Sequence, residues 1–216
     1  MNVICWSCEK EGGRGPFCTS CKTILPPDPG NDRFAVLGLP RKFEIDVAAA
    51  ESAYKDLSRQ LHPDRFAKAD PRARKAALGR TVELNDAWRT VKDPVKRAEY
   101  LLELAGFGLA GDDRQSESEL RKTKQVAAPP TFLIEILELR EELGEAQRAG
   151  DTVRVAFMAE EMQGRAGEAM KTIATALETG KFEEAARTLA ALRYYQRFLD
   201  EVAAHEERSL SGGGRG

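Results

Sequence analysis

Four cysteines near the N-terminus form two Cys-x-x-Cys pairs, Cys5 with Cys8 and Cys18 with Cys21, and nine residues separate the pairs. Thiolates at this spacing are typical ligands of a closed, four-coordinate metal site. The three glycines between the pairs allow the chain to reverse direction. Residues 1–22 contain few apolar side chains and cannot fold by burial alone, so a bound metal explains the segment. We expect a structural zinc without an open coordination position.

Two disulfides or four free thiols are the alternatives to a metal site. All cysteines of the chain lie in this one segment, and the first residues carry no secretion signal, which disfavours disulfides. Iron in the same cage is the remaining alternative, because tetrahedral thiolate ligation also suits it. Trp6 and Phe17 are expected to pack beside the site rather than to read nucleic-acid bases.

A second distinctive stretch is His62-Pro63-Asp64. The apolar pattern of residues 47–61 has steps of three and four and predicts a helix, and another helical pattern begins at Pro71. Pro63 fixes its own φ and disfavours the α conformation at His62, so the first helix must end there. The tripeptide is therefore expected in a short, rigid, polar loop between two helices.

Basic side chains surround this loop. Lys55 and Arg59 lie one helical turn apart and share a face, and Arg65 follows the loop. A basic helix face that leads into an exposed loop is typical of a docking surface for an acidic partner. A catalytic role for His62 is rejected, since the chain has only two histidines and no legible nucleophile–base pair or phosphate loop.

Composition restricts the class of protein further. The 216 residues allow one or two compact domains, and 31% charged residues with a net charge of −2 give no reason to expect nucleic-acid binding. No apolar run is long enough for a membrane span, and no targeting signal is visible, so we expect a cytoplasmic protein.

The pattern after the cysteines predicts an all-α protein with helices joined by short breaks at proline and glycine. The expected segments are a zinc module at 1–22, a stiff Pro-rich linker at 23–30, a four-helix domain at 31–106, a loop linker at 107–130, an antiparallel three-helix bundle at 131–209 and a disordered tail at 210–216.

Three helices carry more apolar residues than one core stripe needs. In the third helix of the four-helix domain, Leu78 and Val82 are expected to widen the buried stripe. In the bundle, the surplus residues lie off the core stripes of the first and last helices: Leu133, Leu137, Tyr194 and Phe198. A wide buried face is one interpretation, and an exposed apolar patch that binds a partner is the other.

The stretch from Tyr54 to Phe66, YKDLSRQLHPDRF, resembles the J-domain family, the co-chaperones of DnaK-type ATPases. Residues 97–107, 132–143 and 192–199 resemble the HscB-type J-proteins of iron–sulfur cluster assembly. The N-terminal double Cys-x-x-Cys is similar to that of eukaryotic HscB-type members. The resemblance spans about residues 31–208 in order, and it implies a J-domain helical hairpin followed by the three-helix bundle.

The resemblance also implies a function and its residues. An HscB-type protein has no active site; it binds an IscU-type iron–sulfur scaffold protein and a DnaK- or HscA-type chaperone, and it stimulates the chaperone's ATPase. The implied chaperone-binding residues are Lys55, Arg59, His62, Pro63, Asp64 and Arg65. The implied scaffold-binding residues are Leu133, Ile134, Leu137, Glu138, Glu141 and Tyr194. Whether the chain is a monomer or a weak dimer stays open.

Two other functions are compatible with parts of the sequence. A general J-protein would deliver unfolded polypeptides to a DnaK-type chaperone, but the long match of residues 131–199 disfavours it. A zinc-ribbon nucleic-acid binder on a helical scaffold is the other, and it lacks the expected basic stripe with interleaved aromatic residues.

Overall fold

The structure is a computed structural model that describes residues 4–13, 15–110 and 123–212 of the chain, with side chains described up to residue 209. Its contacts divide the chain into two compact units, Met1–Arg97 and Ala98–Gly216. Within the described residues, no helix has both the length and the hydropathy that a membrane span requires. The predicted all-α class is confirmed apart from one small sheet.

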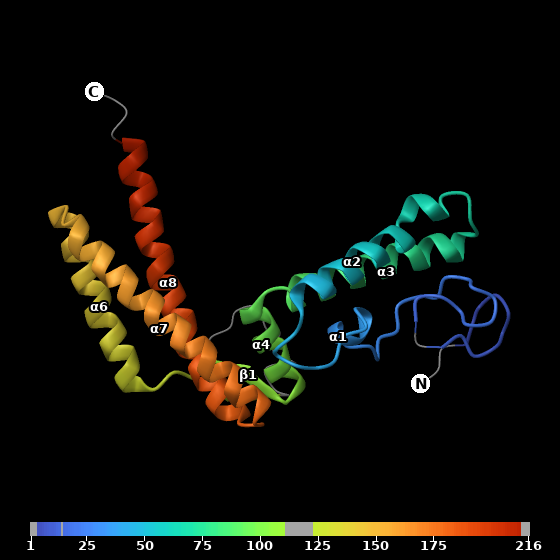
Figure 1. Cartoon of the computed structure of the whole chain (residues 1–216), viewed down its shortest axis with the longest axis horizontal. Helices are drawn as coiled ribbons and strands as arrows, with labels where there is room; N and C mark the ends of the chain where they lie inside the picture. The colour runs from blue at the N-terminus through green and yellow to red at the C-terminus, as the bar shows by residue number, and fades with distance from the viewer. Residues whose placement is uncertain (1–3, 14, 111–122, 213–216) are drawn as a thin grey trace. The chain divides into compact units, whose positions relative to one another are not determined.

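The helices of unit 1 begin and end where capping residues and proline predict. They are α1 (Arg33–Val36), α2 (Val47–Leu61), the 3-10 helix η1 (Pro63–Phe66), α3 (Pro71–Val91) and the start of α4 (Pro94–Leu104), as Figure 1 shows. The carboxylates of Asp46, Asp70 and Asp93 accept hydrogen bonds from first-turn amides of α2, α3 and α4.

The core of unit 1 lies on one side of α3, which packs against α1 and α2. Leu84 and Val91 are buried there, and Trp88 stacks on Tyr54 with ring centroids 5.2 Å apart. The expectation that Leu78 and Val82 widen this stripe is wrong, since they are 59% and 53% exposed. The short α1 and the single partner helix α2 cover only one face of α3.

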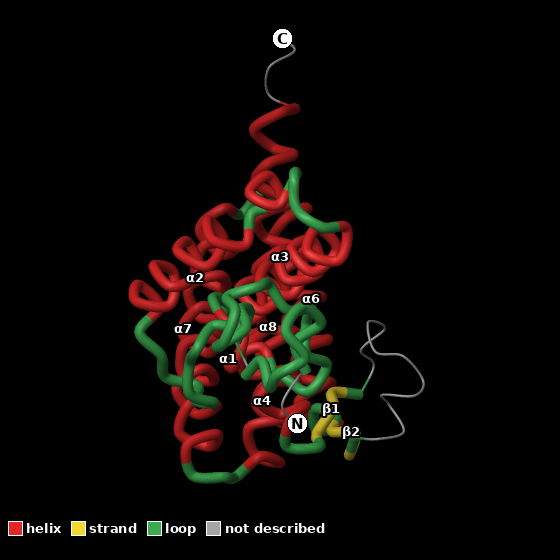
Figure 2. Tube along the Cα trace, turned by 90° about the vertical axis from the view of Figure 1, so that its right-hand side faces the viewer, coloured by secondary structure: helices red, strands yellow, loops and turns green. Residues whose placement is uncertain are grey.

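Unit 2 contains a helical bundle and a two-stranded sheet. Its helices are α6 (Pro130–Ala149), α7 (Thr152–Glu178) and α8 (Phe182–Gly212). Strands β1 (Phe107–Leu109) and β2 (Lys124–Val126) pair in parallel, as Figure 2 shows in yellow, and they contact α8. The expectation of a plain loop at 107–130 is therefore wrong at these strands, and residues 111–122 lie outside the described residues.

The C-terminal boundary also differs from the prediction. Helix α8 continues to Gly212, into the segment 210–216 that was expected to be disordered. Residues 213–216 lie outside the described residues. A long helix keeps its own backbone hydrogen bonds beyond the last residues that pack on a core, so the loss of apolar residues does not mark its end.

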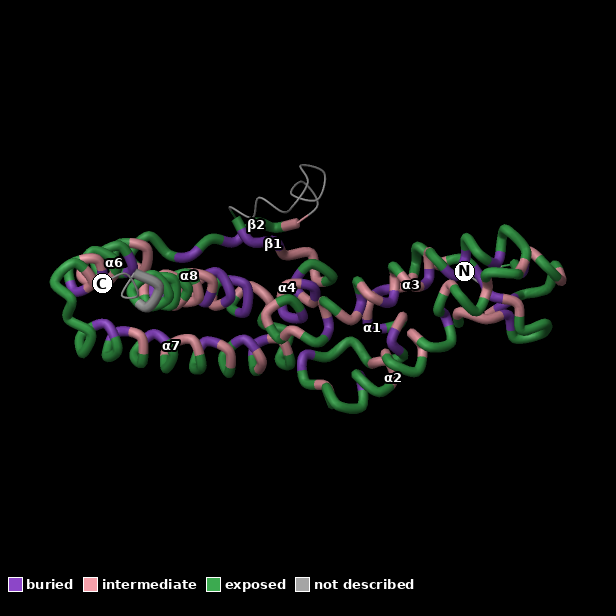
Figure 3. Tube along the Cα trace, turned by 90° about the horizontal axis from the view of Figure 1, so that it is seen from above, coloured by how far each residue is buried: buried purple, intermediate pink, exposed green. Residues whose placement is uncertain are grey.

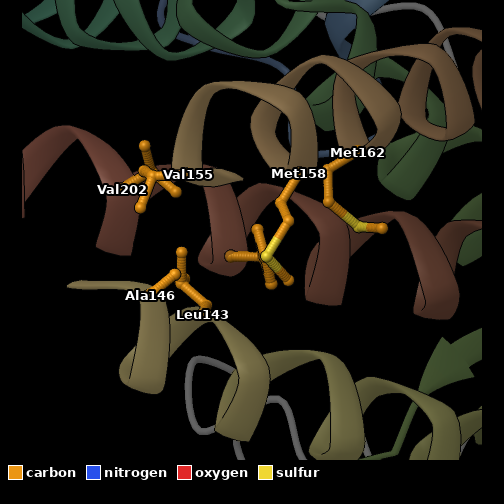
Figure 4. Close-up of a cluster of buried hydrophobic side chains, with 7 residues drawn as sticks. Leu143, Ala146, Val155, Met158, Met162 and Val202 are labelled. Carbon is orange, nitrogen blue, oxygen red and sulfur yellow. The ribbon is translucent and has the colours of Figure 1, made fainter. Parts of the chain in front are cut away.

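The bundle core forms where all three helices meet. Figure 4 shows the side chains of this cluster, which consists of Leu143, Ala146, Val155, Met158, Met162, Phe198 and Val202. Phe198 was expected to lie off the core stripe of α8, but it is fully buried. The reason is that α8 packs against both α7 and α6, so two of its faces are covered. Along α7, buried and exposed segments alternate with each turn (Figure 3).

Phe198 should therefore be critical for the stability of unit 2. Phe198→Ala is expected to lower the free energy of unfolding of this unit by about 3–5 kcal/mol, because it leaves a cavity in a close-packed core. Phe157→Ala is the matched control, since Phe157 is 56% exposed on α7 and its loss should cost little. Hydrogen exchange of α7 and α8 amides measures both. Equal stability of the two variants would place Phe198 outside the core.

Candidate functional site

The four cysteines come together as the spacing predicts. Their sulfur atoms all lie within 4.8 Å of one another, with 3.6 Å between Cys5 and Cys21 and 3.7 Å between Cys8 and Cys18. Zinc–sulfur bonds of about 2.3 Å in a tetrahedron place neighbouring sulfurs about 3.8 Å apart. The observed spacing fits a tetrahedral thiolate site, and the four thiols could hold one metal ion.

The module consists of two matching halves. The amide of Glu9 donates to the Cys5 carbonyl (2.9 Å), and the amide of Lys22 donates to the Cys18 carbonyl at the same distance. Glu9 and Lys22 also share a left-handed backbone, with φ of 59° and 61°. A non-glycine residue adopts this conformation only when its surroundings require it. Each half therefore bends sharply to bring its two thiols to the same point.

The thiols differ in acidity. Hydrogen bonding to the side chain and backbone of Thr23 lowers the pKa of Cys21 to about 6. The Lys10 amide lowers the pKa of Cys8, but desolvation and the neighbouring thiols outweigh it and raise that pKa to about 11. The Cys8 thiol thus resists deprotonation on its own, whereas backbone amides lower the pKa of Cys18 as well. A cation at the centre of the four thiols would remove this restriction, which is the electrostatic condition of a metal site.

The segment 23–30 is not the free spacer that its prolines predict. Ile24 and Leu25 are buried, and the indole of Trp6 donates to the Ile24 carbonyl at 2.9 Å. Leu25 packs against the cysteine cluster itself. From α3, the side chain of Arg80 reaches this segment and donates to the Leu25 carbonyl at 3.0 Å. The module therefore packs as part of unit 1.

Sequence reasoning missed Arg80, which is only 4% exposed. An arginine inside an amphipathic helix is normally assigned to the solvent face, so its type gave no signal. Gly79, the residue before Arg80, did give a signal. Gly79 lies in the middle of α3, where glycine is unfavourable unless another group approaches closely.

The His62-Pro63-Asp64 stretch forms an exposed turn between α2 and α3, as predicted. His62 leaves the helix with φ −56° and ψ 127°, and Pro63 begins η1. The side chains of His62 and Asp64 are 55% and 90% exposed. The Asp64 amide donates to Nδ1 of His62 at 3.3 Å, which sets the orientation of the ring. The hydroxyl of Thr81 on α3 lies 2.9 Å from the Ala77 carbonyl of its own helix and 3.2 Å from the Leu61 carbonyl, so it shares its one proton between them and contacts the base of the loop.

The basic residues near the loop are exposed but partly paired. Lys55 contacts Glu51 at 2.7 Å, and Arg59 forms an ion pair with Asp56 on the same helix. Lys55 is also the main reason that the pKa of Glu51 is lowered. Arg65 is exposed after the loop. These pairs lie at the surface, where they contribute little to stability and can exchange for a partner's carboxylates.

The two surplus residues of α6 differ: Leu137 is 59% exposed, whereas Leu133 is half-buried. Ile134, which the resemblance adds to them, is 57% exposed. Glu138 and Glu141 are exposed beside them. We call these five residues the α6 patch. Their spacing of three and four places them along one side of the helix.

Tyr194 of α8 is half-buried rather than free. Its ring meets the edge of Phe132 at 5.9 Å, and the guanidinium of Arg197 lies over it at 5.6 Å. Phe132 lies about 100° round α6 from its neighbour Leu133, so Tyr194 packs beside the α6 patch and is not part of it. The second interpretation of the surplus, an exposed apolar surface, holds for Leu137 but not for Phe198, and Ile134 is exposed as well.

Comparisons with known proteins match two parts of the chain to two families. Residues 32–100 match the family described as DnaJ domain, and residues 128–203 match the family described as HSCB C-terminal oligomerisation domain. The chain is 29% identical over 198 residues to an iron–sulfur cluster co-chaperone protein HscB homolog of Arabidopsis thaliana, covering 92% of this chain and 72% of that one. It is 30% identical over 203 residues to mouse HscB, with 92% and 80% covered.

Solved structures show the same relationship. The crystal structure of human co-chaperone protein HscB has a TM-score of 0.78 and 27% identity, covering 94% of this chain and 98% of that one. HscB from Vibrio cholerae has a TM-score of 0.68 and 29% identity, with 82% and 99% covered. With both parts of the chain matched in order, the protein belongs to the HscB family of iron–sulfur cluster co-chaperones.

Proposed function

We propose that this protein binds an IscU-type iron–sulfur scaffold protein with its bundle, presents it to a DnaK- or HscA-type chaperone and stimulates that chaperone's ATPase through the His62-Pro63-Asp64 loop. The observation that carries the proposal is the exposed tripeptide, fixed at the end of α2, in a chain whose second unit exposes Ile134 and Leu137. ATP is hydrolysed by the partner, and this protein is not an enzyme.

The loop suits an electrostatic contact. The Asp64 side chain is 90% exposed and lies 3.5 Å from Nδ1 of His62, so its carboxylate is accessible to a cation of the chaperone, while Lys55 and Arg59 attract acidic groups. The ring of His62 already has its orientation set by the Asp64 amide. Pre-orientation lowers the entropy that the contact must overcome.

The α6 patch suits a mixed contact of moderate size. Ile134 and Leu137 supply apolar anchors, and Glu138 and Glu141 supply the polar border that specific interfaces have. An unfolded client would need an adaptable groove rather than one charged, convex helix face. The patch therefore favours a folded scaffold over a general unfolded client.

The four-cysteine module is proposed to hold zinc. The sulfur spacing and the closed set of four thiols support zinc, and the site leaves no position for a substrate. The residues of this site would hold the ion as a structural crosslink between the two halves of the module. The cytoplasmic location expected from the sequence stays a prediction.

Elemental analysis tests the metal. The purified protein is expected to contain about one zinc per chain, and Cys18→Ser should reduce this to near zero, because a buried ligand is lost. Ser20→Ala is the control, since Ser20 lies in the same Cys-x-x-Cys pair as Cys18 but is not a ligand. Iron in place of zinc, or four freely titratable thiols in the folded protein, would overturn the assignment.

Single-turnover ATP hydrolysis by the chaperone tests the loop. Asp64→Asn should reduce stimulation at least tenfold with an unchanged melting temperature, because the side chain is exposed and stabilises nothing in the fold. Stimulation by the unaltered protein should also fall as salt rises, since Lys55 and Arg59 act through screened charges. Asp70→Asn, which alters only the cap of α3, is the control. Full stimulation by the Asp64 variant would contradict the proposal.

Titration calorimetry with the scaffold protein tests the patch. Ile134→Ala with Leu137→Ala should weaken binding about a hundredfold or more, since apolar anchors in interfaces commonly contribute about 2 kcal/mol each. Thermal stability should hardly change, because both side chains are largely exposed. Val153→Ala with Phe157→Ala, exposed on α7, is the matched control. Equal binding by both pairs would remove the α6 patch from the interface and favour a general J-protein.

A further inference from the structure

Arg80 joins the cysteine module to α3. Its Nε donates to the Leu25 carbonyl at 3.0 Å, and one terminal nitrogen donates to the Gly15 carbonyl at 3.3 Å. The other terminal nitrogen contacts Glu83 at 2.9 Å. Burial raises the pKa of Glu83 even though Arg80 opposes that shift. A guanidinium this deeply buried needs these acceptors, because an unpaired buried donor is costly.

Both carbonyl acceptors depend on the fold of the cysteine module. Gly15 lies between the two Cys-x-x-Cys pairs. The side chain of Leu25 is fully buried against Cys5 and Cys18, while its carbonyl faces Arg80. A four-thiolate module of this size folds only with its metal. Loss of the metal would therefore remove the acceptors of Arg80 together with the apolar cover of Leu25.

The backbone of α3 lies directly against the same segment. A Cβ at Gly79 would lie 3.0 Å from Cγ and 3.1 Å from Cδ of Pro27, so a larger residue there requires the proline to shift by a few tenths of an ångström. Next to Arg80, the Thr81 hydroxyl shares its proton between the Ala77 carbonyl at 2.9 Å and the Leu61 carbonyl at 3.2 Å, and α3 also packs against η1, so α3 contacts the His62-Pro63-Asp64 loop at its base. Three consecutive residues of α3 thus connect the cysteine module to the loop.

We propose that metal loading of the four-cysteine module controls the order of α3 and of the His62-Pro63-Asp64 loop, with Arg80 as the positioning residue that transmits it. Loss of the metal loosens the loop even though the cysteines lie far from it in sequence. The coupling between the metal and the loop is inferred from contacts within unit 1 alone. Its effect on stimulation of the chaperone's ATPase rests on the proposed function. The device makes the loop responsive to zinc supply and to oxidation of the cysteine ligands.

Hydrogen exchange of the full chain, measured by mass spectrometry with zinc bound, after chelation and after zinc is added back, tests the coupling. Chelation is expected to accelerate exchange at least about tenfold in residues 62–69 and in the first half of α3, because Arg80 loses two charge-assisted bonds. Amides of α7 and α8 in unit 2 serve as the internal reference and should not change. Added zinc should restore the slow exchange.

Variants identify Arg80 as the link. In Arg80→Met the loop and α3 should exchange as fast with zinc as the unaltered protein does without it, and chelation should add little. Arg89→Met on the same helix is the control, since Arg89 is exposed and should leave the zinc response intact. Gly79→Ala is a second variant that favours the helix itself but displaces Pro27, and it should also weaken the response.

Two results would overturn the coupling. One is unchanged exchange of the loop and α3 after chelation while residues 5–25 lose protection. The other is an unchanged zinc response in Gly79→Ala and Arg80→Met. A zinc-dependent loop in a protein that fails to stimulate the chaperone even when loaded would leave the coupling standing and refute the proposed function instead.

Discussion

The arrangement of unit 1 depends on the hydrogen bonds that the buried guanidinium of Arg80 requires. The side chain of Arg80 lies between its own helix, α3, and the cysteine module. It donates to the carbonyls of Leu25 and Gly15 and pairs with the carboxylate of Glu83. A buried guanidinium is stable only if its neighbours stay in place, so the module, the Pro-rich segment and α3 must keep one arrangement. The loop at His62 benefits from this arrangement, because its base contacts the residue beside Arg80.

In both units the core determines the position of a helix, and the side chains proposed to meet partners lie on its exposed side or just past its end. In α6, Ile136 and Leu143 are buried, whereas Ile134 and Leu137 are exposed. In unit 1 the buried Leu61 is followed at once by the exposed His62. Rigid elements can thus present partner-binding residues without contributing them to stability, which leaves those residues free to serve recognition.

Local chemistry predicted most helix boundaries and the clustering of the four cysteines, because caps, prolines and Cys-x-x-Cys spacing act over a few residues. Local chemistry did not predict the features that depend on contacts between segments far apart in the sequence. Phe198 lies off its own stripe but is buried, since α8 has two partner helices. Leu78 and Val82 continue a stripe but lack a partner. Strands β1 and β2 pair although residues 111–122 separate them in the sequence. Each strand has three residues, which is too short to show the alternation of apolar and polar side chains that predicts a strand. Arg80 was missed because its acceptors lie in another segment.

The duplicated form of the cysteine module bears on how it assembles. In each half, the amide four residues after the first cysteine bonds back to that cysteine's carbonyl, so each bend closes through contacts very near in sequence. Contacts of this kind form quickly, because little chain entropy is lost in closing them. Either half can therefore close its own bend first, and a bound ion would then join the two bends into one folded module. With zinc as the proposed ligand, delivery of the ion rather than the search of the chain would limit the rate of maturation.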